Sequence, residues 1–220
     1  MKPLRFGFAS LAALIAVGFT ATVAVADASP NWHVYNLAPS GRTLTSPVAS
    51  GQGSDLATFD FLNTPATSYL LTSHGDPTVV GDIRGKTVSA TFSVDKSLGA
   101  SFFYDTSGGN TCGGPANTRL FFQTSNEGGF AETHFWWSNP VSMNLDTVIG
   151  RVTISTTVNG QNWSDFFGHF GNDPAHPGFD DAASNTTYIG LSYGGGCFFA
   201  NGVGVENGSA TLHLIDFPVT

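Results

Sequence analysis

Apolar and polar side chains alternate with a period of two along most of this chain. Over residues 87–94, valine, alanine and phenylalanine occupy the even positions, whereas threonine and serine occupy the odd ones. The same alternation recurs at Val152–Ile154, Ile189–Tyr193 and Ala210–Leu214. It is typical of β-strands that bury one face, because successive side chains point to opposite sides. We expect further strands in other apolar stretches, namely Trp32–Leu37, Leu56–Leu62, Tyr69–Thr72, Ala100–Tyr104, Thr118–Thr124 and Phe130–Trp137.

Turn-forming residues separate these stretches, for example at residues 63–65, 75–77 and 127–129, and glycine, proline and asparagine mark turns. After Leu214 the alternation changes phase by one residue. Such a slip indicates a β-bulge or a strand that passes between sheets. Many short strands between tight turns predict an all-β fold: an antiparallel β-sandwich of the jelly-roll or concanavalin-like type, with at most one or two short helices.

One segment departs from the strand pattern. Its aromatic residues follow the i, i+3, i+4, i+7 spacing of an amphipathic helix, and Gly171 is a suitable end for that helix. The residues are Trp163, Phe166, Phe167 and Phe170. We expect a short helix that closes one end of the sandwich. The alternative is an aromatic wall against a ligand.

The N-terminal segment has the pattern of an export signal. Lys2 and Arg5 precede an apolar run over residues 6–23, and the small residues Ala24-Val25-Ala26 follow. We expect a signal peptide over residues 1–26 and a single β-sandwich domain over residues 27–220; an uncleaved membrane anchor is the alternative. The protein is then secreted or at the cell exterior, in the periplasm if the source has an outer membrane, and has no membrane association after signal removal.

Composition and charge exclude several classes of protein. Aromatic residues make up 13% of the chain and charged residues 11%, the reverse of the balance in disordered proteins. The formal net charge of -8 argues against a nucleic-acid partner, because phosphate contacts need lysine and arginine. Nothing in the sequence indicates the oligomeric state.

Cys112 and Cys197 are the two cysteines of the chain, and both lie in glycine-rich stretches. In an exported protein an even number of cysteines favours disulfides. Flanking glycines let the backbone adapt to the geometry of the bridge. We therefore predict a Cys112–Cys197 disulfide, with a buried thiol pair or a metal site as alternatives.

The most informative segment is a predicted hairpin over residues 118–137, with its turn at 125–129. The face with the charged residues should point outward, because burying a charge without a partner is costly. This face is a candidate ligand-binding patch of Arg119, Phe121, Gln123, Glu132, His134 and Trp136. An indole can pack on the C–H face of a sugar while polar groups bind its hydroxyls. The alternative is a Trp136 covered by a loop and a weak Glu132–Arg119 ion pair.

The alternating segments at 85–94 (GKTVSATFSV) and 208–214 (GSATLHL) resemble strands of secreted bacterial jelly-roll domains. Many carbohydrate-binding modules and concanavalin-like domains are built in this way. The resemblance covers most of the mature chain as architecture. It implies a β-sandwich and transfers no site residue.

A catalytic alternative needs two carboxylates that face each other. Glycosidases of similar architecture place them about 5–5.5 Å apart for retention and about 6.5–9.5 Å apart for inversion. Glu132 and Glu206 are the glutamates that the pattern places at sheet positions. The sequence has no Gly-x-Ser-x-Gly nucleophile motif.

Residues 172–181 concentrate oxygen ligands in a loop rich in proline and glycine, as calcium sites do. Asp173, Asp180 and Asp181 are candidate ligands for structural calcium, and the alternative is an ordinary loop with solvated acids. For zinc or copper, His169 and His176 are the histidines of this region, but the sequence has no His-x-His or His-Glu-x-x-His motif. No cofactor is expected to be required.

Together these features predict an exported, non-catalytic binding protein whose ligand is a polysaccharide or other glycan. One alternative is a glycoside hydrolase or polysaccharide lyase with a carboxylate pair. Another is a structural or surface-assembly protein without a small ligand.

Overall fold

The computed structural model describes residues 28–37, 43–49, 55–107, 112–125 and 131–220. The strands are β1 (Ala28–Leu37), β2 (Thr43–Ala49), β3 (Ala57–Asp60), β4 (Thr67–His74), β5 (Thr87–Lys96), β6 (Ser101–Tyr104), β7 (Ala116–Thr124), β8 (Phe135–Ser138), β9 (Met143–Asn144), β10 (Val152–Thr157), β11 (Trp163–Ser164), β12 (Thr186–Gly195), β13 (Val203–Glu206) and β14 (Ala210–Asp216). The helical segments in these residues are the 3-10 turns η1 (Glu132–His134) and η2 (Leu145–Thr147) and the helix α1 (Phe179–Ser184). Within this described part, no helix has both the length and the apolar character needed to cross a membrane.

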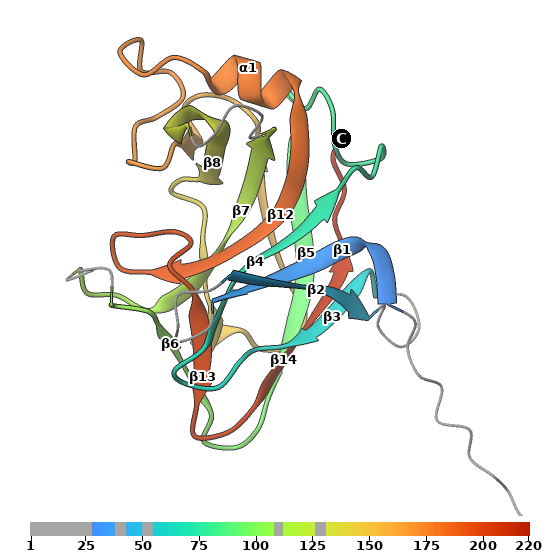
Figure 1. The fold of residues 1–220 in the computed structure, drawn as a ribbon, viewed down its shortest axis with the longest axis vertical. Coiled ribbons are helices and arrows are strands. Elements are labelled where there is room, and N and C mark those ends of the chain that lie inside the picture. Colours follow the sequence, from blue (N-terminus) through green and yellow to red (C-terminus); the bar gives the residue numbers. More distant parts are fainter. Residues whose placement is uncertain (1–27, 38–42, 50–54, 108–111, 126–130) are drawn as a thin grey trace, which may run out of the picture.

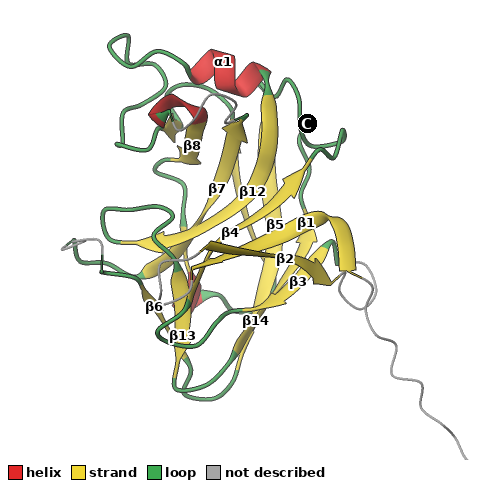
Figure 2. Ribbon diagram, in the orientation of Figure 1, coloured by secondary structure: helices red, strands yellow, loops and turns green. Residues whose placement is uncertain are grey.

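The strands form a continuous ladder that folds over on itself. Its order is β10-β5-β14-β3-β2-β1-β4-β12-β7-β8-β11, and neighbours in this order pair antiparallel. The fold-over lies at β2 and β3, which share the bridge between Ala49 and Thr58. One layer comprises β10, β5, β14 and β3, and the other comprises β1, β4, β12, β7, β8 and β11 (Figures 1 and 2). The predicted all-β antiparallel sandwich is confirmed.

Alternating side chains fill the space between the layers. In β5, Val88, Ala90 and Phe92 are wholly buried, whereas the threonines and serines between them are partly exposed. From the opposite layer, the ring of Tyr193 in β12 lies 5.7 Å from that of Phe59 in β3. A single cluster of buried side chains thus joins both layers. Burial of such apolar surface, worth about 25 cal/mol per Å², is the main favourable term in folding.

The change of phase near the C-terminus is a bulge. β14 pairs with β5 in regular register from Ala210 to Leu214, and the register shifts before Asp216. After the bulge Phe217 turns inward, where its ring packs edge-on against Trp32 at 5.4 Å. The predicted slip is therefore confirmed in its bulge form.

The prediction of a helix over residues 163–170 is wrong. Residues 163–164 form β11 beside β8, and the chain then turns back at Gly168, whose φ of +88° favours glycine. The helix that closes one end of the sandwich is α1 (Figure 2), whose first residue, Phe179, is buried. The same architectural role is thus filled by a different segment.

Several sequence-based predictions fall outside the described residues. The signal peptide, its cleavage site, Phe130 and the turn at residues 126–129 all lie there. Export and the boundary after residue 26 therefore stay predictions.

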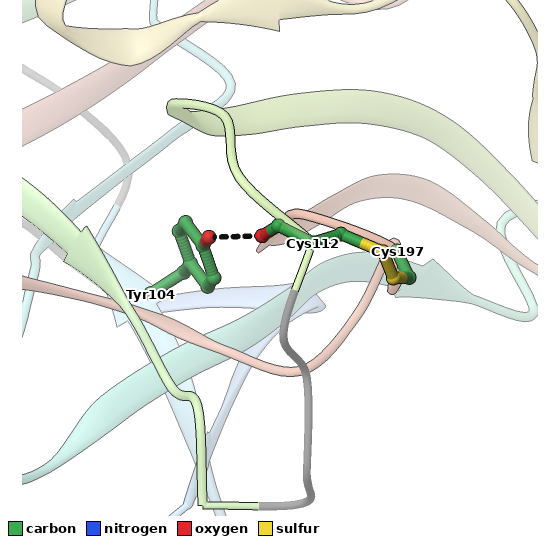
Figure 3. The surroundings of a disulfide bond; sticks show 3 residues. All are labelled: Tyr104, Cys112 and Cys197. Atoms are coloured by element: carbon green, nitrogen blue, oxygen red, sulfur yellow. Dashed lines mark hydrogen bonds between the residues drawn. A yellow bond between two sulfur atoms is a disulfide. The ribbon is translucent and has the colours of Figure 1, made fainter.

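A disulfide joins Cys112 and Cys197, as predicted. The two residues are 85 positions apart in the sequence, and their Cα atoms are 5.3 Å apart. The hydroxyl of Tyr104 donates a hydrogen bond to the carbonyl oxygen of Cys112 at 2.8 Å (Figure 3). The bridge therefore ties the segment before β7 to the loop after β12.

Gly190 of β12 should not tolerate a side chain. An added Cβ would collide with the carbonyl oxygen of Leu71 and lie 2.8 Å from the Cα of Thr72, and these are backbone atoms. We expect Gly190→Ala to lower the free energy of unfolding by about 1–3 kcal/mol in urea denaturation. Gly113→Ala is the matched control, because its added Cβ meets nothing within 4 Å. Equal denaturation midpoints for the two variants would contradict this packing.

Removing the disulfide should destabilise the fold. Closing a loop of 85 residues restricts the unfolded chain, which corresponds to about 4–5 kcal/mol in the chain-entropy model. We expect the double variant Cys112→Ser/Cys197→Ser to unfold at lower urea concentration than the wild type. Reductant should bring the wild type to the midpoint of the variant and leave the variant unchanged. A wild type that is insensitive to reductant would show that the bridge does not contribute.

Candidate functional site

The register between β7 and β8 decides which aromatic side chains face the core. Phe122 pairs directly with Trp136, and Phe121 pairs with Trp137. Directly paired residues of antiparallel strands project to the same face. Trp136 is wholly buried beside Phe122, and its Nε1 donates to the carbonyl oxygen of Thr133 at 2.7 Å. The prediction of an outward-facing Trp136 is therefore wrong, and Trp137 projects to the opposite face.

The error has a local cause. Residues 132–134 form the turn η1, and the strand begins only at Phe135. Strand alternation therefore cannot be counted back from Trp136 to His134 and Glu132. His134 instead lines a hollow with Asp181 of α1, and neither it nor Glu132 occupies a strand position.

Arg119, Phe121 and Gln123 do share one face of β7. On this face Gln123 pairs with Phe135 of β8 and with Tyr188 of β12. Phe121 is nonetheless fully buried and Gln123 is 9% exposed, because neighbouring side chains cover them. The six residues of the predicted patch are thus divided: these three lie together, and Glu132, His134 and Trp136 lie elsewhere.

Aromatic rings from five strands gather on this face of the second layer, which we term the aromatic face. The rings belong to Tyr35 of β1, Tyr69 of β4, Tyr188 of β12, Phe121 of β7, and Phe135 and Trp137 of β8. The rings of Tyr35 and Tyr69 lie 6.1 Å apart. Trp137 lies 5.3 Å from Phe121 and 6.3 Å from Phe135, to which it is nearly parallel.

A first cavity of about 260 Å³ lies among these rings. Its lining consists of Tyr35, Tyr69, Leu70, Thr72, Phe121, Gln123, Phe135 and Tyr188. Burial raises the pKa of Tyr35, and the nearby phenols of Tyr188 and Tyr69 add to this effect. Tyr35 is therefore a neutral hydrogen-bonding group at neutral pH. The cavity combines ring faces with phenol, amide and hydroxyl groups.

A second cavity of about 430 Å³ lies at the Trp137 end of the aromatic face. It is lined by Trp137, Phe166, Phe167, Gly168, Cys197, Phe198, Phe199, Ala200 and Asn201. Phe166 and Phe167 are 45% and 61% exposed, and Phe198 is 39% exposed. The ring of Trp137 also lies 5.3 Å from that of Phe121, which lines the first cavity, and 6.2 Å from that of Phe166.

Asp165, which the sequence analysis did not single out, shapes the loop that carries two of these phenylalanines. Its Oδ1 accepts hydrogen bonds from the backbone N–H groups of Phe167 and His169, each at 2.9 Å. A short acidic side chain that takes these donors competes with helix formation. Phe166 and Phe167 therefore lie in a turn at the rim of the second cavity. Trp163 of the same predicted stripe is wholly buried, and an aromatic wall against a ligand stays a prediction.

Residues 197–201 form the other wall of the second cavity. Cys197 fixes this loop through the disulfide. Asn201 fixes it again, since its Oδ1 accepts from the backbone N–H of Gly195 at 3.0 Å and its side-chain amide donates to the carbonyl oxygen of Asp105. The loop that carries Phe198 and Phe199 is therefore held at both ends.

Arg119 lies under this loop. The ring of Phe199 covers its guanidinium group at 4.0 Å, and Nη1 donates to the carbonyl oxygen of Ser138 at 2.7 Å. Burial lowers the pKa of Arg119 to about 10, so it remains a cation at neutral pH. Among the described residues, two buried donors at this position lack a hydrogen-bond partner: Arg119 Nε and Trp137 Nε1. Such unpaired donors are costly.

The structure does not bring Glu132 and Glu206 together. Glu132 lies in η1, just before β8, whereas Glu206 ends β13, which pairs with β6. β8 and β13 lie toward opposite ends of the molecule (Figure 1). The hydrolase or lyase alternative therefore lacks the facing pair of carboxylates that it requires.

The predicted calcium ligands are spread over two elements. Asp173 lies in a turn, where its Oδ1 accepts from the backbone N–H of Ala175 at 2.9 Å. Asp180 and Asp181 are exposed in the first turn of α1. Calcium binding by residues 172–181 stays a prediction. Three other side chains of the described ranges do lie close enough to share an ion. They are Asp165, His169 and His176, whose ligand atoms lie within 4.8 Å of one another.

No family model and no curated protein matches the chain. Among solved structures, a xylan-binding module, CBM15, is similar over 86% of this chain and 93% of that one, with 15% sequence identity and a TM-score of 0.39. The ligand of this chain is therefore argued from its own residues.

Proposed function

We propose that this is an exported, non-catalytic glycan-binding protein and that the aromatic face is its binding site. The observation that carries the proposal is the gathering of aromatic rings beside phenol, amide and hydroxyl groups in one cavity of the sheet face. A sugar ring has an apolar C–H face that packs on an aromatic ring. Its hydroxyls exchange hydrogen bonds with groups such as Gln123 and the tyrosines. Concave sites with a few oriented polar groups are the usual form of ligand sites.

The shape of the site favours a chain of sugars over a single sugar unit. The cavity of about 430 Å³ is lined by Trp137, and the ring of Trp137 lies 5.3 Å from that of Phe121, which lines the cavity of about 260 Å³. A ligand that follows the aromatic face would cross several strands and contact both cavities. A polysaccharide segment therefore fits better than a free monosaccharide.

The charge of the site favours a neutral glycan. The polar side chains that line the first cavity are uncharged, and the protein as a whole carries a formal net charge of -8. A polyanionic polysaccharide would be repelled by this charge.

Export and the absence of catalysis rest on separate observations. The leader pattern over residues 1–26 and the Cys112–Cys197 disulfide both suit an oxidising compartment outside the cytoplasm. The distribution of Glu132 and Glu206 over different ends of the fold supports binding without hydrolysis.

A second candidate function is docking to a protein or other apolar partner, as in a surface-assembly protein. The observation in its favour is the exposure of Phe167 and Phe198, at 61% and 39%, on the rim of the second cavity. Exposed clusters of large apolar side chains mark interaction sites. The glycan proposal explains the first cavity as well, and so we prefer it.

Single alanine substitutions at the two cavities should weaken glycan binding. Tyr188→Ala removes a ring of the first cavity, and Phe166→Ala removes one of the second. Loss of one stacking ring should weaken binding about tenfold. Retention on insoluble polysaccharides and a glycan array, with circular dichroism as a check of folding, would measure this.

The matched control is Leu98→Ala, at a fully exposed apolar residue outside both cavities, and it should bind as the wild type does. If the wild type bound no glycan, the proposal would fail and the apolar-partner role would remain. Glycan binding that neither Tyr188→Ala nor Phe166→Ala weakens would place the site elsewhere.

Trp136 should affect stability and not ligand contact. Trp136→Ala removes a wholly buried ring that packs on Phe179 at 5.0 Å, and such truncations cost about 3–5 kcal/mol. Phe166→Ala, at a half-exposed position, should cost less than about 1 kcal/mol. Urea denaturation of both variants measures the difference. A Trp136→Ala variant with wild-type stability would mean that β7 and β8 pair in another register.

A further inference from the structure

The loop that carries Phe166 and Phe167 rests on three side chains that could share one ion. Asp165, His169 and His176 each offer a carboxylate oxygen or ring nitrogen, and these atoms lie within 4.8 Å of one another. We propose that they form a binding site for a divalent transition-metal ion of the zinc class. This site does not depend on the proposed glycan function.

The first two ligands are already placed for one ion. Asp165 is 1% exposed, and its Oδ1 is occupied by two backbone N–H groups. Its Oδ2 lies 3.2 Å from Nδ1 of His169. Two ligands bound tetrahedrally at the usual zinc distances of about 2.0–2.1 Å lie about 3.3 Å apart. The observed spacing therefore suits an ion that replaces the proton shared by this pair.

His176 supplies the third ligand from the next turn. Its ring lies 3.4 Å from the ring of His169, with the planes 11° from parallel. The backbone N–H of His176 donates to the carbonyl oxygen of Asp173, which holds the turn. For both nitrogens to point at one ion the stacked rings must part, and His176 can rotate because it is only partly buried. Its exposure also leaves a fourth position for water or another ligand.

The ligand set selects the class of metal. Two imidazoles and one carboxylate suit zinc, copper, cobalt or nickel, whereas calcium and magnesium prefer oxygen ligands alone. Three protein ligands with an open fourth position are typical of zinc sites that are not purely structural. The site is thus chemically distinct from the calcium site predicted for Asp173, Asp180 and Asp181.

A bound ion would stiffen one wall of the second cavity. Asp165 and His169 flank the turn that presents Phe166 and Phe167, and the ion would join this turn to the segment with His176. The ring of Phe167 lies 6.3 Å from that of His169. We therefore expect the ion to order the aromatic rim without contacting the ligand.

The test is zinc binding by the tag-free, chelator-treated protein, followed by isothermal titration calorimetry. We expect one zinc ion per chain and, with cobalt as a spectroscopic substitute, visible absorption of a tetrahedral site. His176→Ala should weaken zinc binding at least tenfold, because it removes a direct ligand and none of the hydrogen bonds that shape the Asp165 turn. The wild-type melting temperature should rise with zinc, and that of His176→Ala should rise much less.

His213→Ala is the matched control. His213 also lies beside carboxylates, at 3.1 Å from Asp55 and 3.5 Å from Asp95, but these contact opposite ring nitrogens and cannot share one ion there. It should bind zinc as the wild type does. Stoichiometry well below one, equal zinc affinity of His176→Ala and wild type, or loss of binding in His213→Ala would each overturn the proposal. Because the assay contains no glycan, its failure is distinguishable from failure of the proposed function.

Discussion

The pairing of β7 with β8 is the constraint on which the rest of the structure depends. Phe122 faces Trp136 and Phe121 faces Trp137, so consecutive aromatic residues are divided between the core and the aromatic face. A slip of one residue would exchange the two sets. Trp136 would then lose its place against Phe179 of α1. The register therefore couples the helix that closes the sandwich to the face that we propose for ligand binding.

The strands could be predicted from the sequence wherever one face is buried against the opposite layer. The alternation of apolar and polar residues in β5 and β14 follows directly from such burial. The change of phase after Leu214 indicated the bulge. Four strands were not predicted from the sequence: β2, the two-residue strands β9 and β11, and β13. β2 contains Pro47, which is unfavourable inside a strand, and β13 is a four-residue segment with a glycine, too short to show a period.

The site was less predictable, for three physical reasons. Alternation fails across a turn, and η1 separates Glu132 and His134 from the strand that carries Trp136. Helical spacing of phenylalanines is also not sufficient for a helix when a carboxylate such as that of Asp165 takes the backbone donors. The loops that meet over Trp137 come from distant parts of the chain, and no local pattern shows their meeting.

The disulfide gives the second cavity a dependence on cellular location. In a reducing compartment, the loop with Phe198 and Phe199 would lose its covalent tie to the segment before β7, and noncovalent contacts such as those of Asn201 and of Phe199 with Arg119 would hold it alone. The cavity wall would become complete only where thiols are oxidised. Under the proposed function, a chain with free thiols would then bind ligand at this cavity more weakly than the oxidised chain. The bridge would thus favour ligand binding in oxidising compartments as well as stabilise the fold.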